Sequence, residues 1–178
     1  MPQNAPARRW MAVVAPLLIV IVFSLYQFLP DASLQPGAHV DKIVVQKASH
    51  TMTLYQNGRA LKTYRISLGK NPVGPKTRTG DGRTPEGNYT LDFRNPNSRF
   101  HKSLHISYPN AADRVAAEQN GVNPGGDIMV HDLQNGLGWI GRFLRFWDWT
   151  DGCIAVTDSE IEEIWRSVHD GTSIEIRP

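Results

Sequence analysis

One cysteine and one histidine are the residues of this chain best suited to catalysis. Cys153 is the only cysteine among 178 residues, and it follows Gly152. A glycine at that position suits the tight turn and close backbone approach that a nucleophile needs. The nearest histidine upstream is His131, and an imidazole beside a thiol can take its proton to form a thiolate–imidazolium pair. The alternative is a small, buried cysteine that does not react.

The N-terminal segment is predicted to anchor the chain in a membrane. Residues 10–29 contain no Asp, Glu, Lys or Arg, and at about 1.5 Å per helical residue they match a hydrocarbon core of roughly 30 Å. Arg8 and Arg9 precede this run, so residues 1–9 are expected to form a cytoplasmic tail. A cleaved signal peptide is the alternative, but the bulky residues 26–30 do not suit its cleavage site.

The remainder is then expected to lie outside the cytoplasm. Residues 30–39 are predicted to be a linker, and residues 40–178 have the length of one domain. The expected location is the inner (cytoplasmic) membrane, with a single pass and a periplasmic or extracytoplasmic domain. Exported cysteines are normally paired, so an unpaired one is either inert or a retained reactive thiol. Basic and acidic residues balance after residue 30, with 17 of each, which leaves no basic footprint for nucleic acid.

Short strands dominate residues 40–178. The signals are β-branched and aromatic runs, alternation of apolar and polar residues, and an Asn57-Gly58 hairpin turn. The connection over residues 71–87 is long and rich in glycine and proline, which is typical of a functional or mobile loop. The predicted strands are Asp41–Gln46, Thr51–Gln56, Ala60–Ser67, Asn88–Phe93, Leu104–Tyr108, Asp127–His131 and Thr172–Arg177.

Two helices carry clear N-terminal signals. Asn110 is a good cap for a helix over Ala111–Gln119. Thr157 and Glu160 form a capping-box pattern before a second helix. The apolar positions of that helix fall on one face at Ile161, Ile164, Trp165 and Val168.

Three stretches of the chain, in order, resemble one family. Residues 66–70 with 83–89 look like its strand, loop and TPxGxY signature. Residues 126–131 look like the strand that ends in its catalytic histidine, and residues 150–154 look like its [S/T]-H-G-C box. Together they resemble the L,D-transpeptidase catalytic domain, also called the YkuD domain, over residues 40–178.

Two positions depart from the usual pattern of that family. The chain has Asp151 where the family usually has histidine, and Ala155 where it usually has arginine. In this the chain is similar to a divergent branch, which includes an enzyme that releases a lipoprotein from peptidoglycan by hydrolysis.

The resemblance implies a mainly β fold, a YkuD-type β-sandwich with a few helices, preceded by one N-terminal transmembrane helix. It implies Cys153 as the nucleophile and His131 as its base. Asp132 inherits the role of orienting the histidine, partly through its backbone carbonyl. The N–H groups of Gly152 and Cys153 are the expected oxyanion donors. This chemistry requires no metal and no organic cofactor.

Substrate contacts are expected from several further side chains. Thr150 and Asp151 belong to the cysteine box, and an ionised Asp151 is expected to point away from the sulfur, where it could orient substrate amines. Tyr108 is expected to line the groove. Arg142 and Arg145 either belong to a lid that meets a substrate carboxylate or are solvated arginines of a helix packed on the core.

His101 and His105 are a poor zinc set, because they lie on a predicted strand without a third ligand, and a strand-edge or groove-lining pair is expected instead.

The function implied is cysteine-dependent acyl transfer on peptidoglycan stem peptides, for crosslinking or for lipoprotein attachment. Hydrolysis of peptidoglycan–lipoprotein bonds or crosslinks by the same two residues is one alternative. A non-catalytic wall-binding module is another. The expected partners are peptidoglycan stem peptides, an envelope lipoprotein and the membrane, with no nucleic acid.

Overall fold

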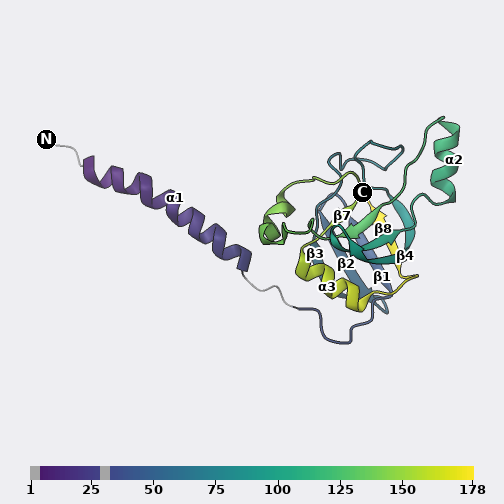
Figure 1. Ribbon diagram of the computed structural model, residues 1–178, viewed down its shortest axis with the longest axis horizontal. Helices are drawn as coiled ribbons and strands as arrows, with labels where there is room; N and C mark the ends of the chain where they lie inside the picture. The colour runs from purple at the N-terminus through teal and green to yellow at the C-terminus, as the bar shows by residue number, and fades with distance from the viewer. Residues whose placement is uncertain (1–4, 29–32) are drawn as a thin grey trace. The chain divides into compact units, whose positions relative to one another are not determined.

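The computed structural model describes residues 5–28 and 33–178 of the chain (Figure 1). The chain divides into two units, Met1–Ser33 and Leu34–Pro178. In the first unit, helix α1 spans Ala5–Phe28. Across the described ranges, we find no helix with the length and apolar character needed to cross a membrane. The predicted anchor over residues 10–29 is therefore not confirmed, and the start of the predicted linker, with residue 29, lies outside the described residues.

The second unit is built on one eight-stranded mixed sheet. Its strand order is β3-β2-β1-β8-β4-β5-β6-β7, and β8 lies in the middle of it, as the yellow arrow in Figure 1 shows. The pairs β1–β8 and β6–β7 are parallel, and the other neighbours are antiparallel. The strands are β1 (Lys42–Gln46), β2 (Thr51–Gln56), β3 (Arg59–Arg65), β4 (Gly87–Ser98), β5 (His101–Ile106), β6 (Met129–His131), β7 (Ile154–Ala155) and β8 (Ser173–Arg177).

The long strand β4 makes the sheet curl. Its first residues, Gly87–Thr90, pair with β8, and the rest pairs with β5 across two register shifts. The chain after β3 then meets the opposite end of the sheet, through bridges from Ser67 to Ala155 and from Gly69 to Thr150. The result is a half-barrel rather than the two-sheet sandwich expected, because one strand takes part in both halves.

Three helical segments accompany the sheet: α2 (Ala111–Gln119), the 3-10 segment η1 (Gly138–Phe146) and α3 (Asp158–Ser167). Helix α3 buries Ile161 and Ile164 completely in the same apolar core as the strands. The Glu160 carboxylate accepts the N–H of Thr157 at 2.9 Å, which completes the predicted capping box. The mainly β architecture with a few helices is confirmed.

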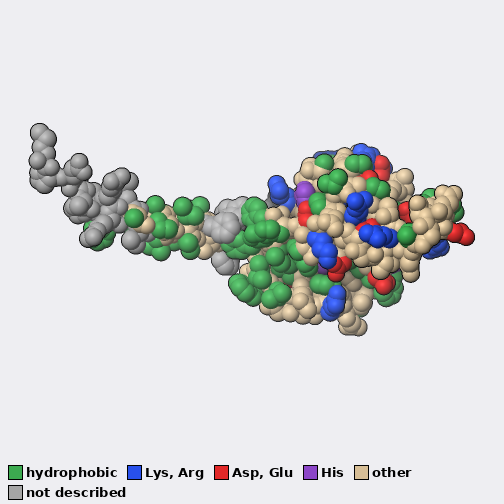
Figure 2. All heavy atoms as spheres, turned by 90° about the horizontal axis from the view of Figure 1, so that it is seen from above, with side chains coloured by type: hydrophobic (Ala, Val, Ile, Leu, Met, Phe, Trp, Pro, Cys, Tyr) green, Lys and Arg blue, Asp and Glu red, His purple; other side chains and the backbone are tan. Residues whose placement is uncertain are grey.

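Charges are mixed on the surface. Figure 2 shows Lys and Arg side chains interspersed with Asp and Glu on the visible face of the Leu34–Pro178 unit. On this face the basic side chains do not form a continuous stripe that could follow a phosphate backbone.

Candidate active site

Strands β6 and β7 place Cys153 and His131 at neighbouring positions of the sheet. In their parallel register, Val130 lies opposite Ile154 and His131 lies opposite Ala155. Cys153 comes two residues before Ala155, and side chains alternate along a strand, so Cys153 and His131 emerge on the same face of the sheet. The offset along the strand is about 7 Å at roughly 3.3 Å per residue, a separation that two inclined side chains can close.

The sulfur of Cys153 sits against the chain that enters β6. The Met129 N–H points at Sγ with a separation of 3.4 Å, and the thiol faces the Asp127 carbonyl oxygen at 3.7 Å. Burial raises the pKa of the Cys153 thiol, while the Met129 N–H acts in the opposite direction. The negative charge of Asp151 adds to the increase.

His131 is held in a dry, aromatic setting. Its ring stacks on Phe100 with centroids 4.1 Å apart, and Trp149 lies edge-on at 5.8 Å. The residue is only 2% exposed, and burial lowers the pKa of His131 to about 4. The imidazole is therefore neutral at pH 7.

The backbone of the next residue fixes the tautomer of this neutral ring. Nδ1 of His131 lies 2.6 Å from the Asp132 carbonyl oxygen, which can only accept, so Nδ1 carries the proton. Nε2 is then left unprotonated and able to take a proton from a thiol. Burial raises the pKa of the Cys153 thiol and lowers the pKa of His131, so it favours the neutral form of each group.

The turn before Cys153 is shaped by a buried threonine. The Gly152 N–H donates to Thr150 Oγ1 at 3.1 Å, and the Thr150 hydroxyl donates to the Cys153 carbonyl at 2.7 Å. Thr150 is 4% exposed, so it holds the turn and is not placed to bind substrate. The expectation that Gly152 supplies an oxyanion donor is also corrected, because its N–H is already used. Within the described residues, the Cys153 N–H has no acceptor and is the donor that remains.

A buried lysine, Lys47, holds the connection over residues 71–87 in place. Lys47 is 3% exposed, and its ammonium group donates to the carbonyls of Gly74 (2.6 Å) and Thr84 (2.9 Å) and to the carboxylate of Glu86 (2.8 Å). Three charge-assisted bonds to one buried ammonium group hold this loop in place.

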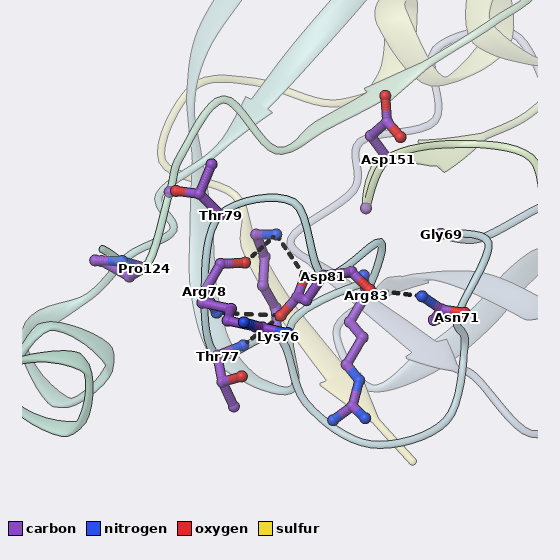
Figure 3. A network of polar contacts seen from close by, with 12 residues as sticks. Gly69, Asn71, Lys76, Thr77, Arg78, Thr79, Asp81, Arg83, Pro124 and Asp151 are labelled. Atoms are coloured by element: carbon purple, nitrogen blue, oxygen red, sulfur yellow. Dashed lines mark hydrogen bonds and ion pairs between the residues drawn. The ribbon is translucent and has the colours of Figure 1, made fainter. Parts of the chain in front are cut away.

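A second buried pair organises the middle of the same loop (Figure 3). Lys76 donates to Asp81 at 2.8 Å, and Asp81 also accepts the N–H groups of Thr77, Arg78 and Arg83. Burial alone would raise the pKa of Asp81, but these donors outweigh it and lower that pKa to about 2. The loop is thus held in one conformation by its internal hydrogen bonds.

Asp151 points out of the site. Its carboxylate is 87% exposed and pairs with the Lys70 ammonium group at 2.7 Å. The hydrogen bond and charge of Lys70 lower the pKa of Asp151. It is therefore an ionised surface group beside the cysteine turn, paired with Lys70.

The carboxylate of Asp132 has a different partner from its carbonyl. Its side chain is fully buried, and Oδ2 lies 2.9 Å from Nδ1 of His101 at the start of β5. Burial raises the pKa of Asp132 to about 6, although the His101 bond acts against that increase. Sequence reasoning did not find His101 as a partner, since no local pattern links it to Asp132.

A cavity of about 370 Å³ lies between the loop and α2. Loop and helix are joined beside it, where the Thr79 N–H donates to the Asn123 carbonyl at 2.8 Å, and Pro124 of the same connection appears near Thr79 in Figure 3. That connection continues to Asp127, whose carbonyl faces the sulfur. The cavity is lined by Pro75, Lys76, Thr77, Arg78, Asp113, Ala116, Ala117, Asn120 and Val122.

Comparison with known proteins identifies the family of this chain. The family model of the L,D-transpeptidase catalytic domain (YkuD) matches residues 41–176. The chain belongs to this family. It is 31% identical over 132 residues to YafK of Escherichia coli (strain K12), which is named as a candidate L,D-transpeptidase. That match covers 71% of this chain but 46% of YafK, so the chain spans about half the length of this relative.

Solved structures share the fold of this L,D-transpeptidase domain. The helical cell shape determining protein Pgp2 of Campylobacter jejuni (K307A mutant) has a TM-score of 0.61 and 25% identity, covering 79% of this chain and 48% of Pgp2. An L,D-transpeptidase from Mycobacterium smegmatis has a TM-score of 0.52 and 17% identity, covering 80% of this chain and 60% of that structure.

One departure from the usual L,D-transpeptidase pattern has a clear structural setting. Ala155, where arginine is usual, is 3% exposed in β7 and lies opposite His131. Its N–H donates to the Ser67 carbonyl at 2.9 Å, and the Ser67 N–H returns the bond at 2.9 Å. These two backbone bonds join the chain after β3 to β7.

Two residues that were expected to contact substrate instead have partners within this L,D-transpeptidase domain. Tyr108 is 3% exposed in the core, where its hydroxyl donates to the Pro124 carbonyl at 3.0 Å, so it does not line a groove. Arg145 of η1 forms a largely buried ion pair with Glu160, and this structural role corrects the expectation that it binds substrate. Arg142 lies half-buried on η1.

Among the described residues, no three His, Cys, Asp or Glu side chains are grouped closely enough to hold a metal ion.

Proposed function

We propose that this domain is a cysteine acyltransferase that acts on peptidoglycan stem peptides. The observation that carries the proposal is the placement of Cys153 and His131 on one face of adjacent strands, with Nδ1 of His131 tied to the Asp132 carbonyl. Membership of the L,D-transpeptidase family supports the choice of substrate.

The acylation step starts from the neutral pair. Nε2 of His131 takes the thiol proton as Sγ of Cys153 bonds to the carbonyl carbon at the L-centre of a diamino acid. The Cys153 N–H donates to the oxygen that becomes negative. His131 then gives its proton to the departing amine of the terminal D-residue, and a thioester remains.

The second step depends on the acceptor. An amine of another stem peptide or of a lipoprotein attacks the thioester and loses a proton to His131, which returns it to the sulfur of Cys153. The product is a crosslink or an anchored protein. Water in place of the amine gives hydrolysis by the same residues, and the departure at Asp151 from the usual histidine makes this a second candidate.

The cavity between the loop and α2 fits the peptide part of a donor or acceptor. Arg78 contributes a cationic rim for peptide carboxylates, while Ala116, Ala117 and Val122 offer a small apolar wall. The site's substrate lies in the cell wall, so we place the domain outside the cytoplasm, with residues 10–29 as the proposed anchor. A role in cell shape, as the name of Pgp2 states for that protein, is part of the proposal.

Mass spectrometry of purified muropeptides incubated with the protein tests the proposal. Dimers would establish transfer, whereas trimmed monomers or released lipoprotein alone would establish hydrolysis. Both must vanish in Cys153→Ala. A wall-binding module is the answer if neither product forms and if carbapenem labelling of Cys153 is slow and unaffected by His131→Ala.

A further inference from the structure

Asp132 connects two histidines through different parts of the same residue. Its backbone carbonyl accepts Nδ1–H of His131 at 2.6 Å, and its buried carboxylate pairs with Nδ1 of His101 at 2.9 Å. The Lys102 N–H adds a longer contact of 3.4 Å to the other carboxylate oxygen. The direction of the carbonyl follows from how the whole residue is held, so a constraint on the carboxylate also orients the bond to His131.

His101 has an acidic neighbour at each ring nitrogen. Nε2 lies 3.2 Å from the carboxylate of Glu162 on α3, while Nδ1 faces Asp132. The ring thus spans from the core helix to the residue that follows β6. An acidic neighbour, Asp158, also acts on Asp132 electrostatically, which makes the donor at His101 more important for keeping that carboxylate in place.

The backbone of His101 indicates that this position is specified by its surroundings. His101 has φ +63°, in the left-handed region, at the tip of the β4–β5 hairpin. A residue other than glycine in this region costs free energy and persists when surrounding contacts determine it, often at functional sites. The neighbouring Phe100 stacks on His131, so the same tip touches the catalytic ring directly.

We propose that His101 is a positioning residue for catalysis: it clamps the Asp132 carboxylate and thereby aims the Asp132 carbonyl at Nδ1 of His131. His101 does not touch substrate in this proposal. Loss of the clamp lets the carbonyl turn, so His131 spends less time with Nε2 directed at Cys153. The inference rests on the proposed function only for its kinetic readout.

The same strand offers a matched control. His105 also pairs with a carboxylate, Asp92, at 2.6 Å, but that pair lies at the surface of the β4–β5 hairpin and has no contact with Asp132 in the described residues. Asparagine tolerates a positive φ, so His101→Asn removes the imidazole without adding backbone strain. His105→Asn makes the equivalent change beside Asp92, which has no contact with Asp132 or His131 in the described residues.

Two measurements on the full chain test the clamp. His101→Asn is expected to lower kcat on the muropeptide substrate by about ten- to a hundredfold with little change in KM, because small misplacements of a catalytic group cost this much. His105→Asn is expected to leave both constants within about twofold, as surface changes away from a site usually do. In NMR spectra, the Nδ1–H resonance of His131 should shift or broaden in His101→Asn and stay in place in His105→Asn.

The NMR readout separates this inference from the proposed function, because it needs no turnover. If wild-type protein makes no product, the resonance of His131 still decides whether His101 acts on it. An unchanged resonance in a folded His101→Asn protein overturns the clamp, as does an equal effect of His105→Asn. If His101→Asn does not fold, Glu162→Gln should move the same resonance and lower kcat about two- to threefold, and no change there overturns the proposal.

Discussion

A methyl group on Gly152 would lie 2.6 Å from the carbonyl oxygen of Arg83. The cysteine turn and the 71–87 loop are therefore in direct backbone contact, and Gly152 adopts φ +135°, which side chains rarely allow. We expect Gly152→Ala to lower activity by about a hundredfold or more, because the loop or the nucleophile must move. Progress curves with muropeptides and urea unfolding would measure both effects.

Gly121→Ala is the control for that prediction. Gly121 also has a positive φ, of +63°, but a methyl group there would meet nothing within 4 Å. It carries a milder backbone strain without the collision, because φ +63° lies in the left-handed region and φ +135° does not, so a modest loss of stability with normal activity is expected. Equal activity losses in the two variants would show that strain, and not contact with Arg83, accounts for the effect.

Phe100 keeps water from one face of the His131 ring. Removing it in Phe100→Ala should raise the pKa of His131 from about 4 toward 6.5, by roughly one unit, because hydration favours the charged ring. NMR titration of the imidazole would give this pKa directly. The acid limb of kcat/KM should move to higher pH with it. Phe93→Ala, at an exposed phenylalanine of the preceding strand β4, should leave the pKa of His131 unchanged.

The burial of His131 also has a consequence for stability. Its pKa is about 4 in the folded protein and near 6.5 when free, so the unfolded chain binds the extra proton first as pH falls. The contribution of this residue is therefore complete above about pH 6.5 and is lost toward pH 4, by up to about 3 kcal/mol.

Urea unfolding of wild type and His131→Asn from pH 4 to 8 isolates that contribution. Asp132, whose pKa is raised to about 6, acts in the opposite sense in the same window but is present in both proteins. The difference between the two curves should widen in favour of wild type as pH rises. A difference that is constant with pH would contradict a buried neutral imidazole.

The cavity between the loop and α2 can be filled from an exposed position. Ala116 lines it, whereas Ala112 lies exposed on the same helix and does not. Ala116→Trp is expected to raise KM for the muropeptide about tenfold or more by occupying the space of a substrate group, with kcat less affected. Ala112→Trp adds the same bulk and should leave KM alone. Similar KM values for both variants would remove the cavity from the substrate site.

Local signals in the sequence were sufficient for much of the fold. The Asn57-Gly58 turn, the caps at Asn110 and Thr157 and most strands were predicted correctly, because each depends on residues close in sequence. Strand β7 was not predicted, since it has only two residues and exists through pairing with β6 and with Ser67.

For the candidate site too, local motifs predicted some features, and features that depend on tertiary contacts were missed. The resemblance pointed to Cys153 and His131 through their motifs, but not to how buried their surroundings are, which shifts the pKa of each group in the direction that favours its neutral form. The contact of His101 with Asp132 follows from the pairing of β5 with β6, and Tyr108 moved from groove to core for a similar reason. Such contacts depend on which strands pair and in which register, and neither can be read from a single sequence.

Strand β8 lies between β1 and β4, yet in chain order it comes after every other strand of the sheet. Residues 42–46 and 87–90 therefore have no shared neighbour until residues 173–177 have emerged from the ribosome. The sheet that carries Cys153 and His131 can therefore be completed only when this last strand pairs with β1 and β4.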